Sequence, residues 1–259
     1  MNISTSLHPH ALDRIGYSTT IPTSALAAGG AEERLPFTVR LVRNEQDLKK
    51  AVDIRHAAYA RHMPSVAETL KEPEALDLDV AAAVLLAESK LDGSPIGTIR
   101  IQSNRFRPLA LEQAIEVPDW LKGKTMAHVS RLGVAQGLSG RLVKTMLIKA
   151  SFQYCENNGI DWAIVAARSP LDRQYAALMF EDIFPGAGYT PLPHMNNVPH
   201  RVMGFEIASG KSRWAAAQHP LLDFFCNTYH PDIDVFDDQG QLVSLSFDQS
   251  RTQQAVRVQ

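Results

Sequence analysis

The chain has 259 residues, of which 45% are hydrophobic and 21% are charged, and its 26 basic and 28 acidic residues give a formal net charge of -2. This composition predicts a globular protein with a substantial core and argues against a nucleic-acid partner. No apolar run is long enough for a transmembrane segment, no secretory signal is apparent, and two isolated cysteines provide neither a disulfide framework nor a metal site, so we expect a cytoplasmic protein without a bound metal.

The composition divides the chain into three parts. Residues 1–35 are rich in Ser, Thr, Ala and Gly, lack hydrophobic periodicity and are expected to form a flexible leader. Residues 36–210 carry the strand and helix patterns of a folded domain. Residues 211–259 are expected to form a helical extension with a polar tail, whose aromatic side chains pack against the domain or a second subunit. Both a monomer and a homodimer are compatible with this pattern.

The domain begins with a strand and a helix. Phe37–Arg43 alternates between apolar and polar residues, which predicts a strand. Asn44 is a suitable N-cap for a helix at Glu45–His62, and Arg55 lies beside the apolar stripe of that helix. An arginine near a buried stripe needs an anionic partner. Arg55 therefore belongs either to a structural ion pair or to a substrate site.

Three carboxylates, Glu74, Asp77 and Asp79, precede the next strand. If this segment is extended, Asp77 and Asp79 project to the same side. Two carboxylates on one side repel each other unless an ammonium, another cation or arginines lie between them. A solvated acidic turn is the alternative interpretation.

A hairpin is predicted after these carboxylates. Val80–Glu88 is almost continuously apolar, as in a strand covered on both faces, and Pro95–Ser103 alternates after a turn. Arg100 lies in the middle of the second strand, where a covered charge requires a partner. We expect that partner to be Asp77 or Asp79.

The central stretch combines a strand, a turn and a helix. Met126–Ala135 is predicted to be extended, Gln136–Gly140 to turn, and Arg141–Asn157 to form a helix. Such a unit can bind an anion, because the turn and the first helical turn offer free N–H groups at the positive end of the helix dipole. An ordinary strand–helix unit is the alternative.

The remaining elements complete a recognisable order. A strand is predicted at Ile160–Ala167, a helix at Pro170–Asp182 and a strand at His200–Ile207. The order β-α-β-β-(α)-β-α-β-α-β indicates an α/β (α+β) fold. We expect a central mixed, mostly antiparallel sheet flanked by helices, with a helical C-terminal extension.

This order and four charged positions resemble a known family. The run Val129-Ser130-Arg131-Leu132-Gly133-Val134 is similar to the Ser-Arg-aromatic/aliphatic-x-Val run of the acyl-homoserine-lactone synthases and the FeeM-like N-acyl amino acid synthases, the autoinducer-synthase-like branch of the GNAT acyltransferase superfamily. That branch carries an Arg in the first helix, an acidic pair before the second strand, an Arg in the third strand and Ser-Arg in the fourth. The corresponding residues are Arg55, Asp77 with Asp79, Arg100, and Ser130-Arg131.

The resemblance extends over residues 37–185 and is greater to the N-acyl amino acid synthases. It implies a bacterial transferase that moves a long-chain fatty acyl group from acyl carrier protein, or from acyl-CoA, to the α-amine of an amino acid or another small amine. The donor thioester, on 4'-phosphopantetheine or CoA, is not a bound cofactor. It would lie along Ser130, Leu132 and Val134, where a backbone N–H can meet the developing oxyanion.

The same resemblance implies roles for the charged residues. Asp77 or Asp79 could take the proton of the amine, and Arg100 or Arg131 could bind the carboxylate of the acceptor. Alternatively, Arg55, Arg100 and Arg131 form a structural network around the two aspartates.

Three features depart from the superfamily pattern. The donor-binding loop would comprise Gln136, Gly137, Ser139, Gly140 and Arg141, but its glycines are out of phase with the usual Gln/Arg-x-x-Gly-x-Gly/Ala, which favours a carrier protein over CoA. Met179 or Phe180 replaces the Tyr that protonates the leaving thiolate, and Tyr175 lies one turn early. Arg141, Lys144 and Lys149 form a basic helix face that could dock an acidic carrier protein or remain solvated.

Other functions therefore stay open at this point. The chain could be an acyl-homoserine-lactone synthase or a short-chain acyl-CoA N-acyltransferase. It could also be a non-catalytic module that binds acyl carriers or senses lipids, which the missing tyrosine and the irregular loop would favour.

Overall fold

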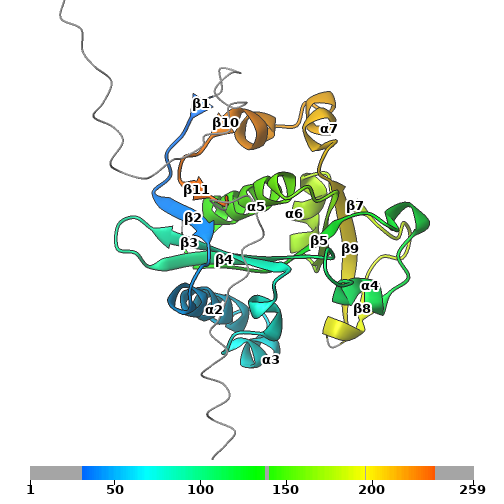
Figure 1. The fold of residues 1–259 in the computed structure, drawn as a ribbon, viewed down its shortest axis with the longest axis horizontal. Coiled ribbons are helices and arrows are strands. Elements are labelled where there is room, and N and C mark those ends of the chain that lie inside the picture. Colours follow the sequence, from blue (N-terminus) through cyan, green and yellow to red (C-terminus); the bar gives the residue numbers. More distant parts are fainter. Residues whose placement is uncertain (1–30, 138–139, 196, 237–259) are drawn as a thin grey trace, which may run out of the picture.

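The structure is a computed structural model that describes residues 31–137, 140–195 and 197–236 (Figure 1). Most elements begin and end close to the bounds that the hydrophobic pattern predicts. The strands are β1 Ala31–Glu32, β2 Phe37–Leu41, β3 Ala82–Ser89, β4 Pro95–Ser103, β5 Met126–Val134, β6 Trp162–Ala167, β7 Glu181–Asp182, β8 Thr190–Leu192, β9 Val198–Glu206, β10 Thr228–Tyr229 and β11 Ile233–Asp234. The helices are α2 Glu45–Ala60, α3 Pro64–Ala67, α4 Ala110–Ala114, α5 Gly140–Asn157, α6 Leu171–Ala177 and α7 Gly210–Ala216. Short 3-10 turns span Glu68–Leu70, Ala75–Leu78, Asp119–Leu121 and Pro193–Met195, and a π-helical turn spans Asp223–Asn227.

The main sheet has the strand order β11-β2-β3-β4-β5-β6-β9-β7, and β8 also pairs with β9. All its neighbouring strands are antiparallel except the parallel pairs β11–β2 and β5–β6. Figure 1 shows α2 and α3 on one face of the sheet and α5 and α6 on the other. The predicted fold, a mixed and mostly antiparallel sheet flanked by helices, is confirmed.

Both faces of the sheet are packed with apolar side chains. Leu85, Ile99 and Leu147 belong to the larger cluster, between the sheet and α5. Val84 and Leu48 belong to a smaller cluster beneath α2. Because β3 contributes to both clusters, its nearly continuous apolar run is explained by burial on its two faces.

The helix α6 is shorter than the sequence pattern predicts. It ends at Ala177, and Met179 takes a left-handed backbone conformation with φ of 66°. The chain then turns into β7, which pairs with β9. A residue with this φ cannot continue a right-handed helix, so the prediction of a helix to Asp182 was wrong.

The C-terminal segment folds back over α5. It contains α7 and the π-helical turn, followed by β10 and β11, two strands that the hydrophobic pattern did not predict. Trp214 and Phe225 pack edge-to-face against Phe152 of α5, with ring centroids 5.7 and 5.8 Å away. The aromatic side chains of this extension therefore pack against the domain.

Lys149 joins this segment to α5. Its side chain is buried, and its Nζ donates to the carbonyl oxygens of Phe224 and Thr228, both at 2.6 Å, and to Nδ1 of His230 at 2.8 Å. Burial lowers the pKa of Lys149 to about 8. The expectation that Lys149 contributes to a solvated basic face was wrong, because that side of α5 is covered.

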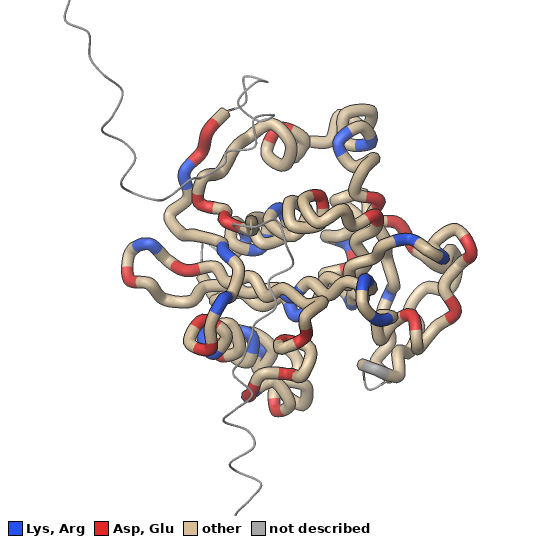
Figure 2. The backbone as a smooth tube through the Cα atoms, viewed as in Figure 1, with Lys and Arg blue, Asp and Glu red and all other residues tan. Residues whose placement is uncertain are grey.

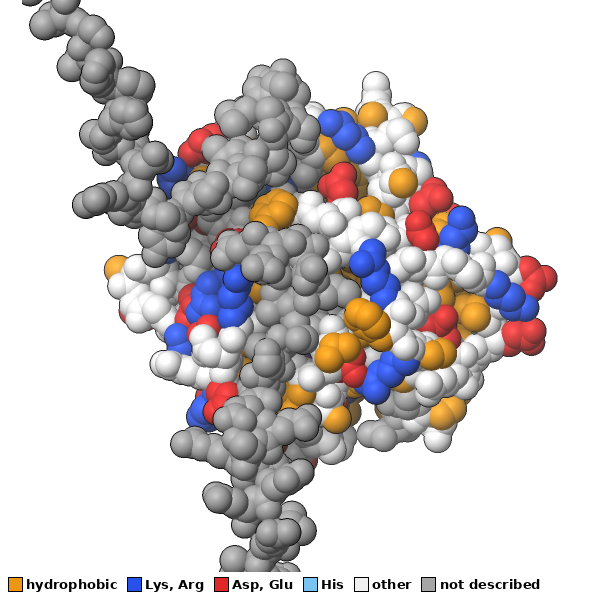
Figure 3. All heavy atoms as spheres, viewed as in Figure 1, with side chains coloured by type: hydrophobic (Ala, Val, Ile, Leu, Met, Phe, Trp, Pro, Cys, Tyr) orange, Lys and Arg blue, Asp and Glu red, His pale blue; other side chains and the backbone are white. Residues whose placement is uncertain are grey.

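The charged side chains are widely distributed. Figure 2 shows basic and acidic residues interspersed along the described chain, and the face in Figure 3 carries both signs side by side with small groups of hydrophobic side chains. Within the described ranges, no helix has the length and apolar character needed to cross a bilayer.

Candidate active site

A bulge in β5 shapes the centre of the sheet. Thr98 pairs with Gly133 and Arg100 with Ser130, so β5 has one extra residue opposite Ile99. Arg131 lies in this bulge with a left-handed φ of 56°. Such a conformation is strained for a residue other than glycine and re-aims the side chain. The bulge turns the guanidinium of Arg131 towards a cavity.

The cavity lies where β5 and β6 separate. These parallel strands pair only between Met126–His128 and Trp162–Ile164. Beyond that point, residues of both strands line an open cavity of about 680 Å³. Because β5 has no strand partner on this side, the backbone N–H and C=O groups that point this way are available to a ligand, except the Val134 carbonyl, which accepts a hydrogen bond from Arg61. The other walls come from α2, α5, α6 and β9.

A glycine allows α2 to approach this part of β5. A Cβ placed on Gly133 would lie 3.1 Å from Cβ of Ala58 and 3.2 Å from Cα of Arg55. These distances are shorter than ordinary van der Waals contacts. Gly133 therefore lets the helix that carries Arg55 pack directly on the strand that carries Arg131.

Five charged side chains form one network behind the cavity wall. Asp77 accepts two hydrogen bonds from Arg55, at 2.7 and 2.8 Å, and one from Arg100 at 3.1 Å. Glu74 accepts one from Arg100 at 3.0 Å and two from Arg131, both at 2.6 Å. Arg55, Asp77 and Arg100 are buried, whereas Glu74 and Arg131 line the cavity.

The network favours the ionised forms of Glu74, Asp77 and Arg131, whereas burial lowers the pKa of Arg100. Burial opposes the negative charge of Glu74, but Arg131, Arg100 and Arg55 outweigh burial and lower the pKa of Glu74. Asp77 behaves in the same way, with Arg55 as its strongest partner, so its pKa is also lowered. Burial alone would lower the pKa of Arg131, but the hydrogen bonds and charge of Glu74 raise it. A carboxylate with a lowered pKa is a poor general base near neutral pH.

The structure separates Asp77 from Asp79. Ala75–Leu78 is a 3-10 turn rather than an extended segment, so the two side chains do not project to the same side. Asp79 instead pairs with Arg107 and accepts a hydrogen bond from the Ala81 backbone N–H. The prediction that Arg100 pairs in this region was right for Asp77, but its second partner is Glu74.

The remaining predicted residues lie in two groups. Ser130, Leu132 and Val134 line the cavity together with Arg131. In the predicted donor loop, Gln136 and Gly137 are exposed, Gly140 begins α5 and Arg141 is exposed, while Ser139 lies outside the described residues. None of these four described loop residues is part of the cavity lining, whereas Lys144, one turn into α5, is.

The lining residues that were missing from the predicted site include Glu74, Lys144, Arg168, Tyr175 and His200. Glu74 could have been found from its spacing, because a capping box joins its backbone N–H to the Asp77 side chain at 2.8 Å. Arg168 and His200 come together only through the pairing of β6 with β9. No local pattern in the sequence indicates that contact.

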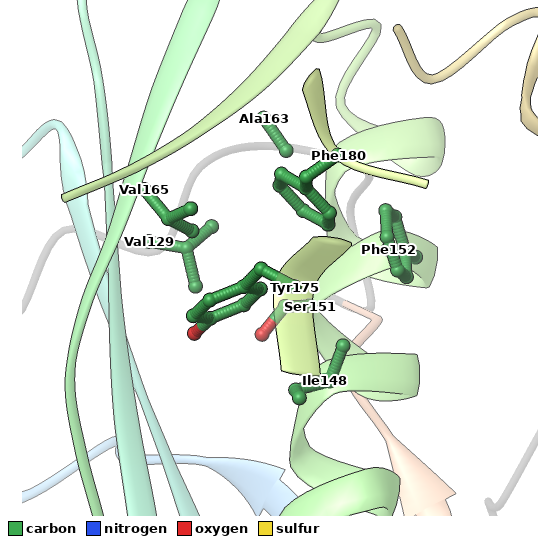
Figure 4. A pocket seen from close by; sticks show the side chains of 8 residues that line it. All are labelled: Val129, Ile148, Ser151, Phe152, Ala163, Val165, Tyr175 and Phe180. Carbon is green, nitrogen blue, oxygen red and sulfur yellow. The ribbon is translucent and has the colours of Figure 1, made fainter. Parts of the chain in front are cut away.

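A small apolar pocket adjoins the cavity (Figure 4). Its volume is about 10 Å³, and it shares Val129, Val165 and Tyr175 with the cavity lining. Figure 4 shows Tyr175 between Val129 and Ser151, with its hydroxyl pointing away from Phe152 and Phe180. Tyr175 therefore forms the boundary between the open cavity and the apolar interior.

The described residues do not bring together three His, Cys, Asp or Glu side chains in a group that could hold a metal ion. The lining that the structure describes offers arginines, one lysine, one carboxylate, two histidines, two tyrosines and the free edge of β5.

Comparison with known proteins identifies the fold. No protein-family model matches the sequence, and no curated protein matches it. The structure is similar to FeeM, an N-acyl amino acid synthase from uncultured soil microbes, with a TM-score of 0.54, 19% identity, and coverage of 70% of this chain and 96% of FeeM.

A weaker similarity is to BjaI, a CoA-dependent acyl-homoserine lactone synthase, with a TM-score of 0.48 and 15% identity. The match covers 75% of this chain and 93% of BjaI. Another is to a GNAT-family acetyltransferase from Staphylococcus aureus, with a TM-score of 0.43 and 13% identity. This match covers 65% of this chain and 99% of the acetyltransferase. The chain shares the fold of FeeM, as the sequence resemblance implies.

Proposed function

We propose that this protein is an N-acyltransferase that moves a fatty acyl group from the thioester of an acyl carrier protein to the α-amine of an amino acid. The observation that carries the proposal is the cavity between the diverging strands β5 and β6, with Arg131 and Glu74 on its wall. The pantetheine arm of the donor carries amide groups, and its thioester develops an oxyanion during the reaction, so both need hydrogen-bond donors. The free edge of β5 at Ser130–Val134 supplies them.

The rest of the lining supports two anionic reactants. Glu74 is the only acidic side chain in the described lining, and Arg131 and Arg100 already bind it. The basic residues of the lining include Lys144 on α5, whose pKa is lowered by burial and by Arg141. A phosphopantetheine arm brings one phosphate, and an amino acid brings one carboxylate. Lys144 is close to the predicted donor loop and is suited to the phosphate.

A carrier-protein donor is favoured over CoA by the loop sequence between β5 and α5. Its glycines do not match the superfamily spacing associated with a pyrophosphate, and a carrier protein presents only one phosphate. The two cysteines, Cys155 and Cys226, are unpaired, which fits a reaction in the reducing cytoplasm.

The test is mass spectrometry of lipid extracts from bacterial cells that express the wild type, Arg131→Gln or the matched control Arg107→Gln. A new series of N-acyl amino acids in the wild type and the control, but not in Arg131→Gln, supports the proposal and identifies the acceptor and chain length. Purified enzyme with dodecanoyl carrier protein and with dodecanoyl-CoA then identifies the donor. A homoserine lactone product, or folded protein that yields no new lipid and transfers no acyl group from either donor, contradicts the proposal.

A further inference from the structure

The β6–β9 end of the cavity holds an arginine and a histidine. Ala167, the last residue of β6, pairs with Arg201 of β9. Continuing this antiparallel register by one residue places Arg168 opposite His200. Residues opposite each other in a sheet project to the same face and lie close together. Both residues line the cavity, whereas Arg201 turns to Asp182 and Asp172.

The hydrogen bonding of His200 fixes its tautomer. Its Nδ1 lies 2.7 Å from the carbonyl oxygen of Val198. A carbonyl oxygen can only accept, so Nδ1 carries a proton and Nε2 of a neutral ring has a free lone pair. Nε2 makes no hydrogen bond within the described part of the chain. It is also not one of the fully buried nitrogen and oxygen atoms that lack a hydrogen-bond partner, so it has some solvent exposure. This nitrogen is therefore accessible from the cavity.

The surroundings keep the imidazole of His200 neutral. Burial lowers its pKa below the usual value, and the positive charge of Arg168 lowers it further, against the opposing effect of the Val198 carbonyl. The neighbouring strand β8 contributes Thr190–Leu192, which includes no charged residue. His200 is thus a buried, neutral base at the cavity wall, which neither Asp77 nor Asp79 is.

Arg168 has no ion-pair partner within the described ranges, and its side chain is exposed at the cavity. Arg61, by contrast, is already bound to the carbonyl oxygens of Ala57 and Val134. A guanidinium can bind a carboxylate through two parallel hydrogen bonds. A carboxylate on Arg168 would hold the α-ammonium of the same amino acid near the ring of His200.

Resting on the proposed acyl transfer, we infer that Arg168 binds the carboxylate of the acceptor amino acid and that Nε2 of His200 is the general base for its amine. Nε2 takes one proton from the ammonium and passes it to solvent. The amine lone pair then forms the C–N bond to the thioester carbonyl, and the C–S bond breaks. The second proton leaves the nitrogen and ends on the departing sulfur. The products are an amide, a thiol and one released proton.

Steady-state kinetics of Arg168→Met and His200→Gln test these roles. The assay uses dodecanoyl carrier protein with the amino acid found in the lipid extracts, and with the corresponding amine without its carboxylate. Arg173→Met and His56→Gln are matched controls, because neither residue lines the cavity. Arg168→Met should raise KM for the amino acid at least about tenfold and leave KM for the simple amine unchanged.

His200→Gln should lower kcat by about 10²- to 10⁴-fold. In the wild type, kcat/KM should fall as pH drops through a pKa below 6.5, because His200 then becomes protonated. This acidic limb should be absent from the residual activity of His200→Gln. An unchanged limb in His200→Gln, or an equal rise in KM for both acceptors in Arg168→Met, overturns the corresponding assignment.

A binding measurement needs no turnover. Calorimetry compares N-dodecanoyl-leucine with its methyl ester on the wild type and on Arg168→Met. The wild type should bind the acid at least about tenfold more tightly than the ester, and Arg168→Met should lose this difference. Equal affinities in the wild type overturn the carboxylate site. If the binding result holds but no thioester is turned over, the proposed function fails and the carboxylate site remains.

Discussion

Glu74 and Arg131 are joined by two hydrogen bonds of 2.6 Å across the wall of the cavity, although 57 residues separate them in the sequence. Arg131 reaches Glu74 from a strained backbone in the β5 bulge, and Glu74 is anchored to the buried pair of Arg55 and Asp77 through Arg100. The buried part of the network thereby fixes the position of Arg131, the arginine of β5 that lines the cavity.

Glu74→Gln is therefore expected to impair acyl transfer. A neutral amide cannot accept both hydrogen bonds of the guanidinium, so Arg131 loses its orientation, and a small misplacement in an active site can cost about 10²-fold in rate. The measurement is kcat/KM with dodecanoyl carrier protein. Asp79→Asn is the matched control, because Asp79 pairs with Arg107 outside the cavity lining. Equal losses in both variants would contradict the role of Glu74.

Arg55→Met is expected to destabilise the whole domain. Arg55 and Asp77 are fully buried and share two hydrogen bonds. Removal of the arginine leaves the carboxylate with Arg100 alone, and breaking a buried ion pair on one side costs about 3–5 kcal/mol. Urea denaturation should show this loss. Lys49→Met, which breaks the exposed pair of Lys49 and Asp53, should leave the transition nearly unchanged. A loss in Arg55→Met no larger than in this control would show that Asp77 finds another partner.

The parts of the fold that local chemistry specifies could be predicted from the sequence. Asn44 caps α2 by accepting a hydrogen bond from the Asp47 backbone N–H, as its residue type and position indicate. The hairpin of β3 and β4 follows from a turn between two apolar segments. The sequence also predicted that a carboxylate pairs with Arg100, because a buried charge in the middle of a strand must be neutralised.

Other features depend on contacts that no local pattern encodes. Asp77 and Asp79 were expected to project to the same side because their segment was assumed to be extended. The segment instead forms a 3-10 turn that begins with the capping box at Glu74. Lys149 resembles a solvated lysine on a helix until the C-terminal segment covers it. Arg168 and His200 come together only because β9 returns beside β6.

Lys149→Met is expected to loosen the C-terminal segment. The ammonium of Lys149 has three donors, and the carbonyls of Phe224 and Thr228 and Nδ1 of His230 accept them. Methionine fills the space but leaves these acceptors without a donor, which should cost at least about 2 kcal/mol. Hydrogen exchange should rise first at β10 and β11 in this variant. Uniform exchange across the domain would contradict a local anchor.

The stability of the wild type should also depend on pH through Lys149. Burial lowers its pKa to about 8 in the folded protein, whereas an unfolded lysine keeps a pKa of about 10.4. Between these two pKa values the unfolded chain binds one more proton than the folded protein, so the free energy of unfolding rises with pH. The part of this free energy that comes from Lys149 is lost as the pH falls through about 8. The difference in unfolding free energy between the wild type and Lys149→Met should follow this curve. A flat difference would mean that the folded pKa is unshifted.

Tyr175→Phe is expected to slow the departure of the thiol. Tyr175 lines the cavity, and its hydroxyl points away from Phe152 and Phe180 (Figure 4). Burial raises its pKa, so the phenol stays protonated and can relay the second proton of the amine, donating its own proton to the departing sulfur and regaining one from the nitrogen. Loss of the hydroxyl should lower kcat about tenfold or more without changing the melting temperature.

The leaving group decides whether Tyr175 acts as this acid. An aryl thioester releases a thiolate that needs little protonation, so the defect of Tyr175→Phe should shrink with an aryl thioester and persist with the pantetheine thioester. Tyr154→Phe is the matched control, because Tyr154 is buried in the core and does not line the cavity. If Tyr175→Phe is equally impaired with both donors, Tyr175 contributes only to the shape of the cavity wall, and the sulfur obtains its proton from the solvent or from the amine itself.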